Sequence, residues 1–212
     1  MEAHRFWLER IGEESQVPSD VLPEVTHPVR LFETLYEHYS ELVQWNPRLS
    51  LVGPGTAEEV LARHYGESLA GVRWIRGDDE TLVDLGSGGG FPGLVLAAAL
   101  PRLQVTLIEA RQRKWAFLKS SIRRCGLSSR CLDARVEASL PAELPARIDV
   151  VTCRAVHLPA RFFEVVLDHS PNARFVLWQG ESPLDLPTNA QVSGESRLPG
   201  SQHRRIVEVR AR

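Results

Sequence analysis

Residues that could do chemistry gather around a glycine-rich stretch in the middle of the chain. Asp84 and Glu109 each end a run of apolar residues, and Gly86, Gly88 and Gly90 follow Asp84 at alternate positions. Glycine adopts positive φ without strain and has no Cβ to hold a ligand away from the backbone. Carboxylates accept hydrogen bonds from amines and hydroxyl groups. We therefore expect a flat, polar molecule to lie against this loop.

The elements on either side of the loop are a strand and a helix. The apolar run Leu82 to Leu85 predicts a buried strand, and Pro92 stands where the first turn of a helix from Gly93 to Leu100 favours proline. A second strand, Leu103 to Ile108, ends at Glu109. Strand, glycine turn and helix open a nucleotide-binding α/β unit, in which ligands bind at the carboxyl ends of the strands.

The spacing of acids and glycines separates two kinds of cofactor. Gly88 to Gly93 matches the dinucleotide fingerprint G-x-G-x-x-G, which alone is a weak indication. The longer pattern acid-x-Gly-x-Gly-x-Gly, beginning at Asp84, is typical of Rossmann-like methyltransferases that use S-adenosylmethionine (SAM). Asp84 would accept hydrogen bonds near the SAM ammonium group but would repel a pyrophosphate. Glu109 is placed to accept hydrogen bonds from both ribose hydroxyls of an adenosyl group, which is also seen in NAD enzymes. The alternative to a SAM site or an NAD site is a glycine turn that binds no ligand.

Composition is that of an ordinary soluble globular protein. With 212 residues, 43% hydrophobic and 25% charged, the chain predicts one α/β domain with a modest extension. No apolar run is long enough to cross a bilayer and the first residues are charged, so we expect a cytoplasmic protein without a membrane partner. Three cysteines without a C-x-x-C pair argue against a disulfide framework and against a metal site.

Positive charge is concentrated locally, although the net charge is only -2. The only lysines, Lys114 and Lys119, share one segment with Arg111, Arg113, Arg123 and Arg124. The segment predicts either a basic binding face or a solvated helix face, and charge alone does not decide between them.

The N-terminal third of the sequence predicts three helices. They run from Glu2 to Glu13, from Pro28 to Trp45, and from a capping box at Thr56 to about Ala70; Asn46–Pro47 should end the second. The apolar face of the second helix comprises Leu31, Leu35, Tyr39, Leu42 and Val43. We expect residues 1–76 to form a helical extension packed on a core formed by residues 77–212, within one compact unit.

The rest of the chain alternates strands with helices, which predicts a mainly parallel sheet covered on both faces. The further strands expected are Arg130 to Leu132, Arg147 to Cys153, Arg174 to Trp178 and an antiparallel Arg204 to Val209; the further helices are Gln112 to Cys125 and Pro159 to about His169. Asp84, Glu109 and Cys153–Arg154 then fall at carboxyl ends of strands.

Four stretches together resemble the RsmG (GidB) methyltransferases: Asn46–Val52, Arg63–Leu69, Asp84–Gly93 and Cys153–Ala155. The resemblance runs in order from about Leu31 to Arg210. It implies a Rossmann-like fold with a seven-stranded sheet, and methylation of nitrogen-7 of a guanine in bacterial small-subunit ribosomal RNA. It also implies SAM as the donor, S-adenosylhomocysteine as the product, and a monomer that acts on the RNA or on the ribosomal subunit.

The family pattern also assigns site residues. It implies cofactor contacts by Gly86, Phe91, the Val136–Glu137 pair and Arg154, where Arg154 could instead hold the guanine. The full cofactor set expected is Asp84, Gly86, Gly88, Phe91, Glu109, Val136, Glu137 and Arg154, and the RNA contacts expected are Arg63, His64, Arg111, Arg113 and Lys114. Guanine nitrogen-7 has a free lone pair and no proton, so no residue is expected to act as a base or nucleophile and positioning should supply the rate.

The chain departs from the family at three places. Glu67 stands where aspartate is usual, Cys153 where serine is usual, and Gln179 where the family has lysine. We interpret Cys153 as a small buried residue rather than a nucleophile. The lost positive charge at Gln179 favours an alternative to the rRNA methyltransferase. In this alternative the chain is a diverged SAM-binding relative that methylates a small molecule or acts as a non-catalytic binding protein.

Overall fold

The computed structural model describes residues 28–55, 57–136, 139–198 and 200–212, which form an α/β fold around one sheet. The strands are β1 (Thr81–Leu85), β2 (Gln104–Glu109), β3 (Arg130–Asp133), β4 (Val150–Arg154), β5 (Arg174–Gln179), β6 (Ala190–Arg197) and β7 (Arg205–Ala211). Their order across the seven-stranded sheet is β3-β2-β1-β4-β5-β7-β6, and β7 runs antiparallel to both of its neighbours. The mainly parallel sheet predicted from the alternating pattern is confirmed.

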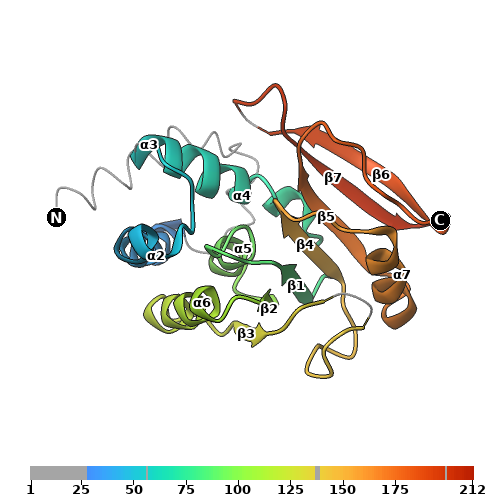
Figure 1. The fold of residues 1–212 in the computed structure, drawn as a ribbon, viewed down its shortest axis with the longest axis horizontal. Helices are drawn as coiled ribbons and strands as arrows, with labels where there is room; N and C mark the ends of the chain where they lie inside the picture. The colour runs from blue at the N-terminus through green and yellow to red at the C-terminus, as the bar shows by residue number, and fades with distance from the viewer. Residues whose placement is uncertain (1–27, 56, 137–138, 199) are drawn as a thin grey trace.

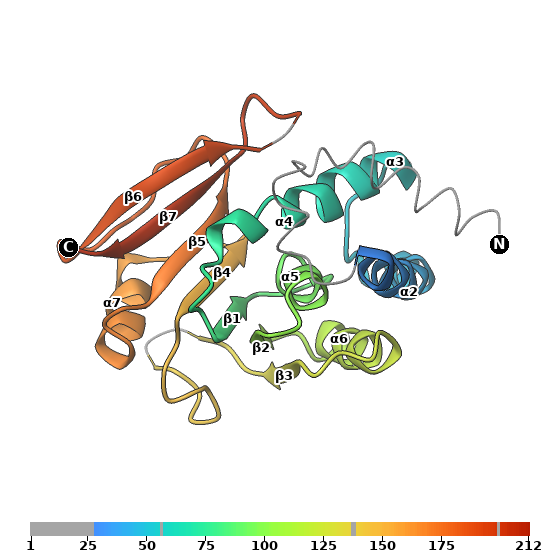
Figure 2. The same ribbon diagram turned by 180° about the vertical axis from the view of Figure 1, so that it is seen from behind.

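Helices cover both faces of this sheet, as Figures 1 and 2 show from opposite sides. The helical segments are α2 (Pro28–Leu49), α3 (Ala57–Val60), the π-helical turn η2 (Leu61–Gly66), α4 (Glu67–Leu69), the short 3-10 turn η3 (Val72–Trp74), α5 (Gly93–Ala99), α6 (Gln112–Arg124) and α7 (Ala160–His169). Successive residues of β1 point to opposite faces: Leu82 packs in the cluster with α5, and Val83 packs in the cluster with α7. Central strands are therefore apolar on both sides, as parallel sheets require.

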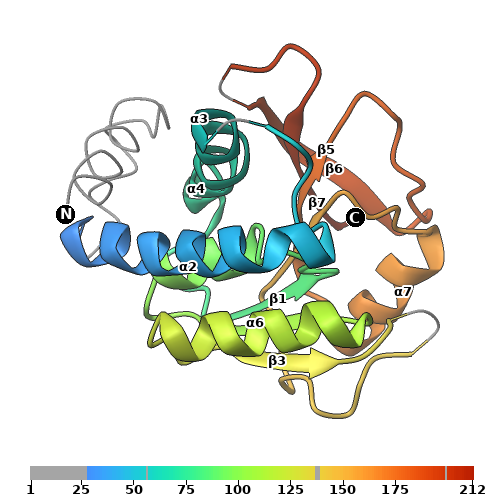
Figure 3. The same ribbon diagram turned by 60° about the vertical axis from the view of Figure 1, so that its left-hand side comes forward.

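Helix α2 forms an additional layer, packed against α5 and α6 (Figure 3). Its buried positions are Leu31, Leu35, His38, Glu41 and Leu42, which recur at helical spacing. The prediction that Val43 belongs to this face is wrong, because its side chain is 52% exposed. A polar histidine takes part in the buried face instead.

The prediction that Asn46–Pro47 ends this helix is also wrong. Helix α2 continues to Leu49 with Pro47 inside its last turn. The Asn46 side chain instead fixes the segment after the helix, since its Oδ1 accepts hydrogen bonds from the Leu51 and Val52 amides at 2.8 and 2.9 Å.

The third predicted helix is present but interrupted. The π-helical turn η2 separates α3 from α4, which the sequence pattern did not indicate. Thr56 of the expected capping box, and the whole expected helix from Glu2 to Glu13, lie outside the described residues. None of the described helices is long and apolar enough to span a membrane.

Two strand predictions need correction. Strand β4 begins at Val150, not Arg147, because the Asp149 carboxylate accepts hydrogen bonds from the Glu80 and Thr81 amides ahead of the ladder. Strand β6 was not predicted, because its alternation is polar and it lies at the sheet edge.

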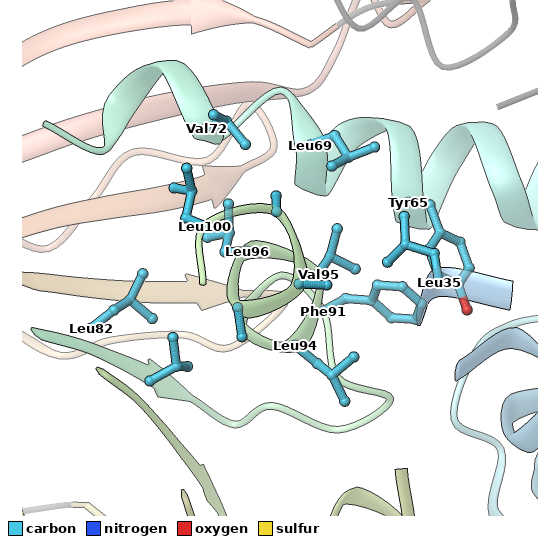
Figure 4. Close-up of a cluster of buried hydrophobic side chains, with 14 of the residues drawn as sticks. Leu35, Tyr65, Leu69, Val72, Leu82, Phe91, Leu94, Val95, Leu96 and Leu100 are labelled. Carbon is cyan, nitrogen blue, oxygen red and sulfur yellow. The ribbon is translucent and has the colours of Figure 1, made fainter. Parts of the chain in front are cut away.

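The N-terminal helices and the sheet share one apolar cluster (Figure 4). Leu35, Tyr65 and Leu69 from these helices pack in the same cluster as Leu94 and Leu96 of α5. The division of the chain at residue 76 stays a prediction, and the shared cluster is what holds α2 and η2 beside the glycine loop.

Candidate functional site

The loop between β1 and α5 forms the floor of the site. Gly86, Gly88 and Gly90 have φ values of 63°, 52° and 88°, in the region that favours glycine. The Ser87 amide donates to the Ile108 carbonyl at 3.1 Å, which fixes the loop to β2. The backbone of the loop is thus held in place at the carboxyl ends of the central strands.

Asp84 lies beneath this loop. Its side chain is 0% exposed, and its Oδ1 accepts a hydrogen bond from the Thr152 hydroxyl at 2.7 Å. A Cβ at Gly93 would come within 2.5 Å of the Asp84 Cβ, so only glycine allows this approach. Burial raises the pKa of Asp84 to about 6, although the hydrogen bond from Thr152 opposes the shift. The side chain therefore lies under the loop and away from the surface, and the expected contact of Asp84 with the cofactor stays a prediction.

Glu109 does reach the cleft. Its Oε2 accepts from the Gly88 amide at 3.0 Å and its Oε1 from the Arg111 amide at 2.9 Å. Each carboxylate oxygen has a second lone pair for a ligand hydroxyl. The carboxylate therefore joins the end of β2 to the glycine loop and borders the cavities on both sides.

Two cavities meet above the glycine loop. One, of about 520 Å³, is mostly apolar and is lined by Ile108, Val136 and Phe162 among others. The other, of about 330 Å³, is bordered by Phe91, His64 and Arg154. They share Gly86, Glu109, Arg111 and Val156, so they adjoin each other at the glycine loop and together form the cleft. Glu137, expected beside Val136, lies outside the described residues.

Arg154 forms one wall of the smaller cavity. Its Nη2 donates to the Arg63 carbonyl at 2.9 Å and to Glu67 Oε2 at 2.8 Å, and only 12% of its side chain is exposed. Burial lowers the pKa of Arg154, and the Glu67 carboxylate opposes this. The guanidinium thereby ties the end of β4 to the π-helical turn η2.

Glu67 is a buried carboxylate between two arginines. Its Oε1 lies 2.7 Å from a guanidinium nitrogen of Arg204, just before β7, and Arg154 holds its other oxygen. Burial raises the pKa of Glu67, against the effect of both arginines. Sequence reasoning missed Arg204, because nothing in its local pattern indicates a partner so distant in the chain.

His64 lies on the π-helical turn between this ion-pair cluster and the glycine loop. Its ring centroid is 5.1 Å from that of Phe91, at an interplanar angle of 37°. Burial, together with Arg154, Arg63 and Arg204, lowers the pKa of His64 to about 3. The imidazole is therefore neutral at physiological pH.

The basic residues expected to contact RNA are only partly brought together. Arg111 and Lys114 line the smaller cavity opposite His64, and Arg63 is exposed on the adjoining turn. Arg113 is exposed on α6 but is not among the described residues that line this cavity.

Residues 32–196 match the family model for rRNA small subunit methyltransferase G, GidB. The chain belongs to this family. It is 36% identical over 189 residues to "Ribosomal RNA small subunit methyltransferase G" of Myxococcus xanthus, covering 88% of this chain and 83% of that relative. Identity to the protein of the same name from Gluconobacter oxydans is 44% over 115 residues, 54% of this chain, and the match spans only 56% of that relative.

Solved structures show the same fold at low identity. TrmN from Thermus thermophilus superposes with a TM-score of 0.57 at 18% identity, covering 72% of this chain and 53% of that one. The mitomycin 7-O-methyltransferase MmcR gives 0.52 at 15% identity, covering 84% and 68%. The architecture is the Rossmann-like methyltransferase fold, as expected from the resemblance to the RsmG family.

Proposed function

We propose that this protein is a SAM-dependent methyltransferase that modifies nitrogen-7 of a guanine in bacterial small-subunit ribosomal RNA. Membership of the rRNA small subunit methyltransferase G family supports the reaction and the substrate class. The observation that carries the proposal is the cleft over the glycine loop, in which an apolar cavity adjoins one lined by cationic side chains.

The residues of the cleft fit SAM. A Cβ at Gly86 would lie 2.7 Å from Val156 Cγ2, so glycine is what allows the loop to approach Val156 where the two cavities adjoin. We assign the adenosyl group to the larger cavity, with Glu109 accepting its ribose hydroxyls and Val136 beside the adenine. Phe91 and Arg154 border the neighbouring cavity, where Arg154 would bind the methionine carboxylate; Gly88 and Glu137 complete the proposed contacts, and Asp84 acts through the loop.

Catalysis in this proposal depends on positioning. When bound, SAM supplies an electrophilic methyl group, whose transfer leaves a neutral thioether and a positive charge on the methylated guanine. Guanine nitrogen-7 needs no base, so the protein has only to align it with the donor. Cys153 is 1% exposed and burial raises its pKa to about 12, which does not suit a cytosine-methylating nucleophile.

The cationic half of the cleft is the proposed place of the RNA. It is lined by His64, Arg111 and Lys114, Arg63 is exposed on the adjoining turn, and Arg113 lies farther along α6. Gln179, where the family has lysine, is the register partner of Arg205 in β7, and the Arg205 guanidinium lies 3.4 Å from a carboxylate oxygen of Glu195. We infer a monomer that acts in the cytoplasm on the RNA or on the assembled subunit.

Calorimetry followed by label transfer tests the proposal. SAM and S-adenosylhomocysteine should bind and NAD should not, and labelled methyl should pass to undermethylated small subunits. Digestion of the RNA should then release labelled 7-methylguanosine. Binding of SAM without transfer to RNA would support the alternative, a diverged relative with another acceptor.

A further inference from the structure

His64 presents an unused aromatic surface to the acceptor side of the cleft. The ring is half-buried and borders the smaller cavity, with Phe91 packed against it at a centroid distance of 5.1 Å. Within the described part of the chain, no hydrogen bond is found at either nitrogen of the His64 ring. Neither ring nitrogen is needed to hold the side chain, and the aromatic surface is available to a ligand.

The turn that carries this ring is fixed from two directions. Arg154 binds the carbonyl of Arg63 and the carboxylate of Glu67, on either side of His64 in the chain. The next residue, Tyr65, is fully buried, and its hydroxyl lies 2.8 Å from His38 Nδ1 of α2. A ring held in this way loses little conformational entropy when a ligand packs on it.

The charge of the ring suits the reaction proposed above. Methylation at nitrogen-7 makes guanine a cation, which a protonated imidazole would repel. The nearby arginines and burial keep His64 neutral, with a pKa of about 3. A neutral aromatic face instead attracts a developing cation.

We propose that His64 is the stacking platform for the target guanine, which enters the cleft unstacked from its RNA neighbours. Sequence-specific RNA recognition commonly places splayed bases on aromatic side chains, and enzymes that modify bases take them out of the stack. This inference rests on the proposed function and adds a base-contacting residue to it.

Two substitutions of similar size separate stacking from other roles. His64→Phe keeps an aromatic face and removes both ring nitrogens, whereas His64→Leu removes the face. We expect His64→Phe to retain kcat/KM for undermethylated subunits within about threefold, and His64→Leu to lower it by about ten- to hundredfold. Both should bind SAM as the wild type does. His64→Gln introduces a polar side chain without a ring, so it should lower kcat/KM as His64→Leu does. It replaces His64→Leu as the test if that variant does not fold.

The outcomes distinguish this inference from the proposed function. Wild-type protein that transfers no methyl group to the subunits contradicts the function itself. Active wild type with equally defective His64→Phe and His64→Leu shows that a ring nitrogen matters and overturns the stacking role. Full activity in His64→Leu, or a parallel loss of SAM affinity, overturns it as well.

Discussion

The carboxyl group of Asp84 is buried where its charge is costly. The Thr152 hydroxyl donates a hydrogen bond to it at 2.7 Å, and its side chain is fully buried beneath the glycine loop. Its pKa in the folded protein is about 6, above the ordinary value of 3.8, because burial favours the neutral form. Folding therefore binds a proton at this group, and its ionisation lowers the free energy of unfolding as pH rises from about 3.8 to about 6.

The first prediction is that Asp84→Asn stabilises the free protein at neutral pH. The asparagine oxygen can still accept from Thr152, but no charge forms beneath the loop. Relative to wild type, the free energy of unfolding should rise by about 1–3 kcal/mol at pH 7.5, and the gain should shrink at pH 5. Denaturant melts at the two pH values measure this; a difference that does not change with pH would contradict it.

Asp149 provides a control of opposite sign. Burial alone would raise its pKa, but hydrogen bonds from the Glu80 and Thr81 backbone outweigh this and lower it. Ionised Asp149 therefore stabilises the fold above its ordinary pKa, and the contribution is lost as pH falls. Asp149→Asn should destabilise the protein at pH 7.5, and by less in acid.

At the scale of elements, one ionic cluster joins the C-terminal strands to the π-helical turn. Arg204 precedes β7, Glu67 begins α4, and Arg154 ends β4. The Trp178 indole adds a hydrogen bond to the Glu67 carbonyl at 2.7 Å. Because Glu67 is 3% exposed, loss of either arginine leaves a buried carboxylate less well compensated.

The second prediction compares Arg204 with its neighbour Arg205. Arg205 pairs with Glu195, and that carboxylate is 58% exposed, so this ion pair should contribute little. Arg204→Gln should lower the free energy of unfolding by about 1–2 kcal/mol, and Arg205→Gln by less than about 0.5 kcal/mol. Arg204→Gln should also reduce turnover on RNA more than SAM affinity, since Glu67 supports the turn that carries His64. Equal effects of the two variants would contradict the role of the cluster.

Elements with a clear local pattern were predictable, and those that depend on distant contacts were not. The strand at Leu82 to Leu85 and the glycine loop follow from apolar runs and turn chemistry. The local pattern did not show that α2 continues through Pro47 to Leu49, and Arg204 becomes a site residue only through the fold. Glu109 was correctly expected at the end of β2, whereas no sequence pattern shows that Asp84 lies below the loop.

At the scale of the whole molecule, positive charge borders the cleft although the chain is slightly acidic. Arg111 and Lys114 at the start of α6 line the smaller cavity together with His64 of the π-helical turn, on which Arg63 is exposed. Lys114 Nζ also lies 3.4 Å from the Ser50 carbonyl after α2, a long contact that leaves the ammonium exposed. An RNA strand that reaches the cleft would therefore meet cations from both sides.

The last prediction concerns the salt dependence of RNA binding. Each phosphate contact releases counterions, so log affinity falls linearly with log salt, and loss of one contact reduces the slope by about one. Arg111→Ala with Lys114→Ala should weaken RNA binding and reduce the slope by up to about two, and should change SAM affinity less, although Arg111 also borders the larger cavity. Arg123 is exposed in the last turn of α6, so Arg123→Ala is the matched control. This variant should change neither the affinity for RNA nor the slope of its salt dependence. If affinity falls in the double variant while the slope stays constant, Arg111 and Lys114 hold the loops around the cleft, and the phosphates bind elsewhere.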